Sequence, residues 1–428
     1  MDPSAALAAA LTECLPDPPP PRLGVAVSGG GDSIALTLLM ADWAAARATP
    51  VALHAVTVDH GLRPESAAEA RGAKRFAHDL GLTHDTLTWS EAGASAGNLQ
   101  DSARRARQRL IANWAHEQGI GHVLLDHTRD DQAETVLLRL ARGSGVDGLS
   151  AMAPQRVALG ITWLRPLLTL SRAALRDFLT ARGADWREDP SNADTRFDRV
   201  KAREALAVLA PLGIEAAGLV RTAQRMDRAR VALSGAAFEL AQRITRVEAG
   251  DVLIEREGLF AAPDDLRDRV LAQALRWVAS ADYRPRHAAL MRVMERLRAE
   301  QAATLHGCRI MPEATGHLRV LRELRAVRDA QAPPGELWDR RWRLIALHDK
   351  DLRENAAARL RVGALGEKGL AACPQWRRSG LPRASLMAGP ALWHGETLIA
   401  APLARHGQGW QAELTPPGGA FLDGFLSR

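Results

Sequence analysis

The stretch Leu23-Gly24-Val25-Ala26-Val27-Ser28-Gly29-Gly30-Gly31-Asp32-Ser33 decides the fold of this chain. Its apolar beginning, residues 23–27, predicts a buried strand, and the apolar run at residues 34–40 predicts a helix. The three glycines between them let the backbone approach a phosphate closely, and the first N–H groups of a helix have no partner within it. We therefore predict an anion site here, to which Ser28 and Ser33 add hydroxyl donors. A glycine-rich turn without a ligand is the alternative interpretation.

Strand and helix patterns alternate outward from this loop. Apolar runs at residues 51–58, 84–89 and 122–126 predict strands, and the segments between them predict helices. These repeats predict an α/β fold, with a Rossmann-like parallel sheet that helices cover on both faces. Ligands bind such sheets at the carboxyl ends of the strands. Asp59-His60 and Asp126-His127 follow strands as the loop does, so we expect all three at one edge.

Asp32 stands directly after the three glycines, where its carboxylate would repel bound phosphates unless a cation lies between them. Mg²⁺ binds through one or two carboxylates and phosphate oxygens, so Asp32 is a candidate Mg²⁺ contact. Stabilising the helix dipole is its alternative role. At the next strand end, Asp59 and His60 are candidate site residues, and Arg63 offers a guanidinium for phosphate or carboxylate. A lone Asp-His pair in such a place is otherwise structural.

A third polar group, Asp126-His127-Thr128-Arg129-Asp130-Asp131-Gln132-Ala133-Glu134-Thr135, opens a helix. Asp130 and Glu134 lie four residues apart and therefore on one helix face. Acids in a first helical turn often only complement the dipole. Three carboxylates beside a phosphate loop could instead hold a second cation, a substrate amine or a general base. Together with Asp32 and Asp59, the acids Asp130, Asp131 and Glu134 are therefore the five candidate catalytic residues.

Composition and length limit the class of protein. The 428 residues suffice for two or three domains, and no apolar run approaches the roughly 20 residues that span a bilayer. The first residues have neither the pattern of a signal peptide nor that of a transit peptide. Cys14, Cys308 and Cys373 are far apart, which supports neither a zinc ribbon nor a local redox pair. We therefore expect a cytoplasmic protein without a membrane partner.

Three domains are expected along the chain. Residues 1–214 form the α/β domain, residues 215–330 a helical middle domain, and residues 331–428 a small α+β domain after the linker Ala332-Pro333-Pro334-Gly335. Residues 1–214 hold 23 Lys or Arg and 25 Asp or Glu, whereas residues 215–428 hold 33 and 25. The excess of positive charge thus lies in residues 215–428, on the C-terminal side of the phosphate-loop domain. It is mostly arginine, which suits bidentate contacts to phosphate. Charge alone is weak support for an RNA partner.

Several motifs together resemble a known family, the tRNA(Ile)-lysidine synthases of the PP-loop ATP pyrophosphatase superfamily. They occur in the family's order in the first half of the chain, whereas residues 305–323 and 382–402 match the family's later domains more loosely. The motifs are Ser-Gly-Gly-Gly-Asp-Ser at 28–33, Val-Asp-His-Gly-Leu-Arg at 58–63, Gly97-Asn98 with Ala103-Arg104-Arg105-Ala106-Arg107, Asp130-Asp131-Gln132-Ala133-Glu134-Thr135, Arg165-Pro166-Leu167-Leu168 and Glu188-Asp189-Pro190-Ser191-Asn192.

The resemblance implies a fold like that of the adenine nucleotide alpha hydrolases and a reaction. ATP would activate O2 of the wobble cytidine in a CAU anticodon of tRNA(Ile) as an adenylate, with release of pyrophosphate. The amine of free L-lysine would then attack C2, and AMP would leave. Residues 215–428 would bind the tRNA body, and a homodimer remains open. The residues that would bind ATP are Ser28, Gly29, Gly30, Gly31, Asp32, Ser33, His60 and Arg63, and those that would bind the other substrates are Arg104, Arg107, His127, Arg139 and Arg142.

Three other functions share parts of this pattern. A tRNA thiolase adenylates a base with the same loop, but the spacing of the three cysteines does not suit its chemistry. A small-molecule amide ligase would not need the arginine-rich second half. A non-catalytic RNA-binding protein with a relict nucleotide fold would not need Asp32, Asp130, Asp131 and Glu134 together.

Overall fold

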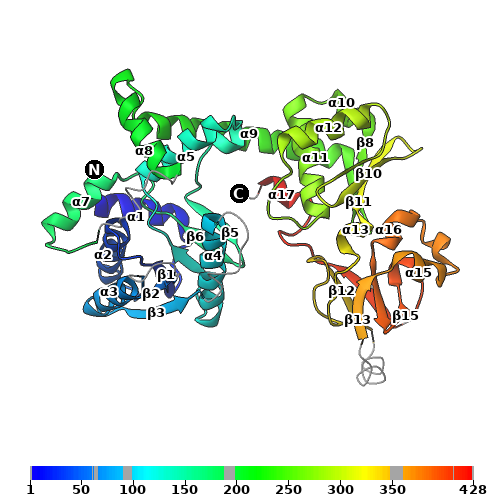
Figure 1. The fold of residues 1–428 in the computed structure, drawn as a ribbon, viewed down its shortest axis with the longest axis horizontal. Coiled ribbons are helices and arrows are strands. Elements are labelled where there is room, and N and C mark those ends of the chain that lie inside the picture. The colour runs from blue at the N-terminus through cyan, green and yellow to red at the C-terminus, as the bar shows by residue number, and fades with distance from the viewer. Residues whose placement is uncertain are drawn as a thin grey trace. The chain divides into compact units, whose positions relative to one another are not determined.

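The computed structural model describes residues 2–59, 61, 66–89, 99–187, 198–347, 360–407 and 409–426, without the side chains of residues 99–104. The chain folds into two compact units, residues 1–230 and residues 231–427 (Figure 1). We call them unit 1 and unit 2. The boundaries expected after residues 214 and 330 stay predictions.

Unit 1 is built on a six-stranded sheet with the order β3-β2-β1-β4-β6-β5. Neighbouring strands from β3 to β6 are parallel, as the strand-helix repeats predict, whereas β5 pairs antiparallel with β6. The antiparallel edge strand was not expected from the sequence. The strands are β1 (Arg22–Ala26), β2 (Ala52–Asp59), β3 (Thr83–Thr88), β4 (His122–Leu124), β5 (Gln155–Ala158) and β6 (Ile161–Leu164).

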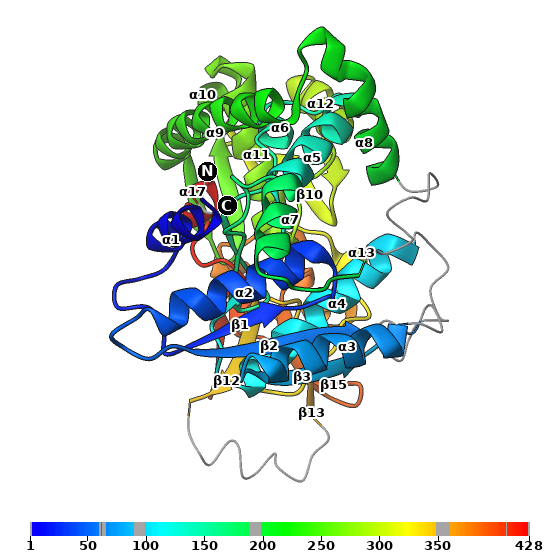
Figure 2. The same cartoon turned by 90° about the vertical axis from the view of Figure 1, so that its left-hand side faces the viewer.

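Helices cover both faces of this sheet, which confirms the expected α/β fold. Leu23 and Val25 of β1 point into a core with α1, α2, α3 and α7, whereas Val56 and Val123 pack against α4 on the other face. Figure 1 shows α2 and α3 on one side of β1–β3 and α4 on the other, and Figure 2 shows α7 beside α2. The helices are α1 (Pro3–Cys14), α2 (Gly31–Ala45), α3 (Ser66–Asp79), α4 (Leu99–Glu117), α5 (Arg129–Ala141), α6 (Val146–Leu149), α7 (Arg172–Ala181) and α8 (Asp198–Leu209), followed by the 3₁₀ turn η2 (Ala210–Leu212).

The strand order places a switch point at β1 and β4. The chain moves from β1 to β2 on one side of β1 and later crosses to β4 on the other side. Ligands of open α/β sheets bind outside the carboxyl ends of strands at such a point. The glycine loop follows β1, and residues 126–128 follow β4, so the fold brings these two segments to the same place.

Unit 2 combines helices with three antiparallel sheets, of orders β7-β8-β11-β10-β9, β12-β16 and β13-β14-β15. The alternation of residues at 304–321 around Gly307 and Gly316 predicts a strand pair, where the structure has the three strands β9–β11. The hairpin β7–β8 was not expected. Unit 2 begins within α9 (Ala216–Ile244). It continues with β7 (Thr245–Glu248), β8 (Asp251–Glu255), α10 (Arg256–Ala261), α11 (Asp264–Val278), α12 (His287–Arg298), β9 (Ala303–Leu305), β10 (Cys308–Pro312), β11 (His317–Arg322), α13 (Leu324–Val327), β12 (Trp342–Ala346), β13 (Leu360–Ala364), α15 (Gly366–Ala371), η3 (Trp376–Ser379), α16 (Arg383–Met387), β14 (Pro390–His394), β15 (Thr397–Ala400), η4 (Pro402–Ala404), β16 (Trp410–Leu414) and α17 (Asp423–Leu426).

The end of the chain completes the core of the preceding helices. Phe421 and Phe425 of the last segment are buried among residues of α11 and the five-stranded sheet. The rings of Trp277 and Phe421 meet edge to face, with centroids 5.9 Å apart. These buried rings join the end of the chain to the core of α11 and the five-stranded sheet.

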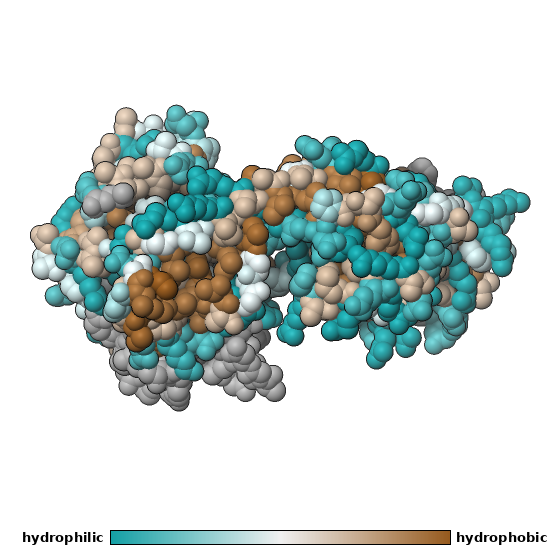
Figure 3. Space-filling model, turned by 90° about the horizontal axis from the view of Figure 1, so that it is seen from above, coloured by the Kyte–Doolittle hydropathy of each residue, from teal (hydrophilic) through white to brown (hydrophobic). Residues whose placement is uncertain are grey.

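Surface and helix properties differ between segments. In the space-filling view, hydrophobic residues gather on part of the surface of unit 1, whereas the visible surface of unit 2 is more hydrophilic (Figure 3).

Among the described helices, none is by itself long and apolar enough to cross a membrane. One pair, Asp198–Leu212 and Ala216–Ile244, passes the length and composition criteria jointly but is bent by 99° at the break.

A buried polar network ties the five-stranded sheet of unit 2 to α16. Asp251 accepts hydrogen bonds from Ser385 Oγ (2.5 Å) and Arg319 Nη1 (3.1 Å), and Arg319 also pairs with Glu248 and Glu313. Burial raises the pKa of Asp251 to about 6, although Ser385 and Arg319 act in the opposite direction. The ionised carboxylate is therefore less favourable in the folded chain than in the unfolded one.

We expect the variant Asp251→Asn to remove a pH-dependent contribution to stability. Between the ordinary aspartate pKa and about 6 the folded chain binds more protons, so the stability of the wild type falls as the pH rises through this range. Relative to the variant, the wild type should lose up to about 3 kcal/mol of unfolding free energy between pH 4 and pH 8. Denaturant unfolding at several pH values measures this difference. A difference that is independent of pH would contradict the prediction.

Candidate functional site

Ser33 organises the glycine loop from inside. Its buried Oγ accepts hydrogen bonds from the N–H groups of Ser28 and Gly29 and from Ser28 Oγ, each at 3.1 Å, and donates to Gly30 O at 2.9 Å. Gly29 has φ +87°, a left-handed conformation that favours glycine. The loop then enters α2 at Gly31, so the first N–H groups of this helix are available to an anion.

A second segment of the chain packs against this loop. The N–H of Arg187 donates to Gly29 O at 3.3 Å. A Cβ on Gly31 would lie 3.2 Å from Cδ1 of Trp186. A side chain at position 31 would therefore crowd Trp186, which packs closely on the third glycine of the loop.

We expect the variant Ser33→Ala to loosen the loop. Loss of a buried hydroxyl with four partners should lower the unfolding free energy by about 1–3 kcal/mol and weaken ATP binding. Thermal unfolding and ATP titration measure the two effects. Ser28→Ala is the matched control for stability because Ser28 is exposed, and it should lower the unfolding free energy less than Ser33→Ala does. An equal loss of unfolding free energy in the two variants would contradict a central role for Ser33.

A single arginine, Arg172, contacts the carboxylates of α2 and α5. Arg172, the first residue of α7, contacts Asp32 through Nε (3.3 Å), Glu134 through Nη1 (2.6 Å) and Asp131 through Nη2 (2.7 Å). Its backbone N–H donates to Asp130 Oδ2 at 2.9 Å. Four of the five predicted catalytic acids, contributed by α2 and α5, therefore meet at the start of α7. We call this group the Arg172 cluster.

Local structure positions each member of the Arg172 cluster. Thr128 caps α5, since its Oγ1 accepts from Asp131 N and its own N–H and Oγ1 donate to Asp131 Oδ2. Ser171, a residue type whose place before a helical run predicts an N-cap, does cap α7, with its Oγ accepting from Ala174 N at 3.2 Å. Two helix N-termini thus point their first turns toward the same carboxylates, a favourable direction for both helix dipoles.

Two arginines of α8 add positive charge to the Arg172 cluster. Arg199 lies 3.4 Å from Asp131, and Arg203 lies 3.1 Å from Glu134. The side chain of Glu134 is only 1% exposed, so its charge depends on these partners. Its Oε2 is buried and has no hydrogen-bond partner within the described residues. This unpaired oxygen is enclosed by its neighbours, so a buried water molecule, or a substrate amine after the cluster opens, could supply its missing hydrogen bond.

The acids differ in their ionisation. Burial raises the pKa of Asp32 to about 6, an effect that Arg172 opposes and that Asp126 and Asp131 reinforce. Burial and the neighbouring Asp131 also raise the pKa of Asp126 to about 6. Burial would do the same to Asp131, but Arg172 and the Thr128 N–H outweigh it and hold the pKa of Asp131 below its usual range. One site therefore offers a firmly ionised carboxylate beside two that take up protons readily.

The other predicted site residues have varied surroundings. Asp59 ends β2 and accepts from Gly61 N at 3.0 Å, which turns the chain after the strand. Arg139 Nη1 donates to Gly148 O and Ala151 O and so fixes the loop after α5. Arg142 is exposed and pairs with Asp198 at 3.1 Å. Arg107 favours the ionised form of Asp126, and His127 that of Asp131.

His60, Arg63, the side chain of Arg104, and the motif parts 97–98 and 188–192 lie outside the described residues. The roles of all these residues stay predictions.

Sequence reasoning missed the residue at the centre of the Arg172 cluster. Arg172 stands just after the predicted cap Ser171, and Asp126 was noted only as the end of a strand. The available signal was an imbalance of charge, because three acids in one helical turn beside an anion loop require cations nearby. That requirement was assigned to Mg²⁺ and lysine, whereas the chain supplies Arg172, Arg199 and Arg203 itself.

One family model and several known proteins are similar to this chain in sequence. A family model described as a PP-loop domain matches residues 3–209. The tRNA(Ile)-lysidine synthase of Ruegeria pomeroyi is 48% identical over 414 residues, which cover 96% of this chain and 95% of that protein. The tRNA(Ile)-lysidine synthase of Rhodopseudomonas palustris is 48% identical over 241 residues, covering 56% of this chain and 68% of that protein. The enzyme of the same name from Wolbachia pipientis is 37% identical over 298 residues, covering 68% of each.

Proposed function

This chain belongs to the tRNA(Ile)-lysidine synthase family, and from that premise we propose that it joins lysine to C2 of the wobble cytidine of a tRNA(Ile) with a CAU anticodon. The chemistry has two steps. O2 of the cytidine attacks the α-phosphorus of ATP, and pyrophosphate leaves. The lysine amine then bonds to C2, the C2–O2 bond breaks and AMP leaves. The observation that carries the proposal is the Arg172 cluster directly beside the glycine loop.

The glycine loop acts in the first step. The free N–H groups at the start of α2 and the hydroxyl of Ser28 would hold the phosphates of ATP, where charge builds up as pyrophosphate leaves. Asp32 uses one carboxylate oxygen for Arg172, which leaves the other for a cation. His60 and Arg63 would contact the nucleotide from the neighbouring strand end, and Asp59 remains a candidate catalytic residue.

Mg²⁺ fits this arrangement as a companion of the nucleotide. The described residues hold no group of three or more His, Cys, Asp or Glu that could bind a metal on its own. Mg²⁺ usually takes one or two protein carboxylates together with phosphate oxygens, and Asp32 supplies one. When bound there, Mg²⁺ would neutralise charge on the phosphates.

The acids of the Arg172 cluster act in the second step. A lysine ammonium needs carboxylates with free acceptor capacity, and the buried Oε2 of Glu134 has it. Lysine must lose a proton before its amine can attack, and a carboxylate with a raised pKa, such as Asp126, is a suitable acceptor. Arg104, Arg107, His127, Arg139 and Arg142 would hold the anticodon or the adenylate.

The remaining expectations concern partners and place. Residues 215–428 would bind the tRNA body, since they hold the excess of arginine. A reaction on tRNA with ATP and free lysine places the protein in the cytoplasm. A homodimer stays a prediction, which light scattering of the purified chain would test.

Incubation with ATP, labelled lysine and tRNA transcripts tests the proposed function directly. Label should enter tRNA with a CAU anticodon, with AMP and pyrophosphate formed in equal amount. A transcript in which the wobble cytidine is replaced by uridine is the matched control and should stay unlabelled. AMP formation without entry of lysine into the RNA would contradict the proposal.

A further inference from the structure

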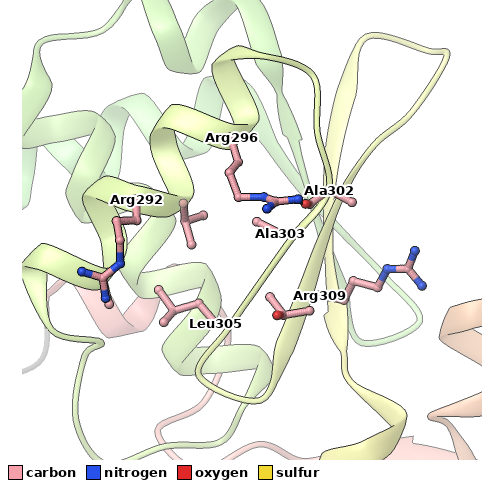
Figure 4. Close-up of a pocket in the computed structure, with 9 residues that line it drawn as sticks. Arg292, Arg296, Ala302, Ala303, Leu305 and Arg309 are labelled. Carbon is pink, nitrogen blue, oxygen red and sulfur yellow. The ribbon is translucent and has the colours of Figure 1, made fainter.

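Unit 2 contains a groove that no part of the proposed chemistry uses. It has a volume of about 470 Å³ and lies between α12 and the strands β9 and β10. Three arginines surround it, Arg292 and Arg296 from the helix and Arg309 from the strand (Figure 4). Small residues, among them Ala302, Ala303 and Thr304, form much of the remaining wall, and no acidic residue lines it.

The positive charge of this groove is not neutralised within the described residues. The side chains of Arg292 and Arg309 form no hydrogen bond or ion pair there, and that of Arg296 donates only to Ala302 O at 3.1 Å. All three side chains are exposed. The nearby Glu300 pairs with Arg256 at 3.3 Å, and Glu295 is exposed on α12 without lining the groove. The described part of the chain therefore places no counter-charge in the groove, in contrast to the Arg172 cluster.

The arrangement of the arginines selects among anions. Figure 4 shows the head groups of Arg292 and Arg309 extending away from each other on opposite sides, with Arg296 reaching toward Ala302 between them. Arginines that point in different directions suit a strand with several phosphates better than a single phosphate. Arg292 and Arg296 are neighbours on one helix face, and Arg309 adds a third cation from the strand β10. The groove has no aromatic side chain on which a base could stack, so backbone contact without sequence reading is expected.

We propose that the groove formed by α12, β9 and β10 binds the sugar-phosphate backbone of the tRNA substrate through Arg292, Arg296 and Arg309. The identity of the RNA rests on the proposed function, whereas the chemistry of the groove does not. Such contacts position the RNA without reading its sequence. Each contact should appear as a counter-ion released on binding, and therefore in the salt dependence of affinity.

Two triple variants of the full chain test this assignment. The first replaces the groove arginines (Arg292→Ala, Arg296→Ala, Arg309→Ala). The second replaces three exposed arginines of unit 2 that do not line the groove (Arg243→Ala, Arg286→Ala, Arg328→Ala) and thus removes equal charge. The affinity for a tRNA transcript with a CAU anticodon is measured between about 50 and 200 mM salt, a range in which phosphate contacts have a strong effect. ATP affinity and inorganic phosphate affinity are measured alongside.

The groove variant should lose about two to three units from the slope of log affinity against log salt and bind the tRNA at least about tenfold more weakly. The control variant should change far less, and ATP affinity should not change in either. An equal loss in both variants, or lost phosphate binding with unchanged tRNA affinity, would overturn the proposal. If the triple variant is unstable, Arg292→Ala with Arg309→Ala suffices, since neither side chain has a partner within the described residues.

The same variants separate this inference from the proposed function. Lysine incorporation by the wild type tests the function alone, and tRNA affinity of the groove variant tests the groove alone. A wild type that binds tRNA through the groove without adding lysine would refute the function and keep the groove. A wild type that adds lysine to tRNA would support the function, and a groove variant with unchanged tRNA affinity would refute the groove.

Discussion

The variant Arg172→Ala is expected to lower pyrophosphate release by about a hundred- to a thousandfold and the unfolding free energy by about 3 kcal/mol. The reason is that the single positive charge of Arg172 lies beside three carboxylates. Its guanidinium contacts Asp32, Asp131 and Glu134, and the last of these is almost completely buried. Without Arg172 the three carboxylates repel one another, and only the two α8 arginines remain beside Asp131 and Glu134.

Two further variants make this prediction specific. Arg172→Lys keeps the charge but has a single ammonium in place of a planar fork, so it should retain part of the stability and little of the activity. Arg182→Ala is the matched control at the other end of α7, where an exposed pair with Asp42 contributes at most about 1 kcal/mol. Thermal unfolding and a pyrophosphate assay give both readouts. Arg172→Ala with the stability and activity of Arg182→Ala would show that the cluster does not depend on this arginine.

The second large effect is expected from Asp32→Asn, which should abolish activity without weakening the fold. Pyrophosphate release should fall by at least about a thousandfold, because the variant loses the carboxylate that faces the phosphates. Burial raises the pKa of Asp32 to about 6, so the ionised group costs the folded chain stability above that pH. At pH 8 the variant should therefore unfold with a free energy equal to or higher than the wild type, by up to about 3 kcal/mol.

The pH dependence provides the control for this variant. At about pH 3 the carboxylate is mostly protonated in both folded and unfolded chains, so the two proteins should differ little in stability there. Chemical denaturation at about pH 3 and at pH 8 measures the change. A variant that is less stable than the wild type at pH 8, or that still releases pyrophosphate at a substantial rate, would contradict this role of Asp32.

The parts of the fold that sequence predicts well have strong local patterns. The glycine loop, the parallel strands and the cap Ser171 all follow from a few adjacent residues. The strand β5 and the hairpin β7–β8 were missed because they are short, carry charged residues and are stabilised by pairing rather than by apolar alternation. Pairing partners are distant in sequence or depend on a turn, so local pattern does not reveal them.

The candidate site shows the same division. The acids were found because they share one helical turn and follow a strand. Arg172 was not, because its contact with Asp32 joins residues 140 positions apart and results from the packing of α7 beside α2. Arg139 has a contact that its sequence context does not reveal, since its Nη1 donates to the carbonyls of Gly148 and Ala151. Its expected role toward the substrates stays a prediction.

The sharing of Arg172 among three acids has a consequence for how this protein can vary. Losing the arginine is harmful mainly because it leaves the acids unbalanced, so losing one acid as well should repair part of the folding defect. The effects of changes at Asp32, Asp131, Glu134 and Arg172 are therefore expected to be non-additive. In evolutionary terms these positions are epistatic: each restricts which substitutions the others tolerate, and a lineage that abandons the activity is expected to lose the acids and the arginine together.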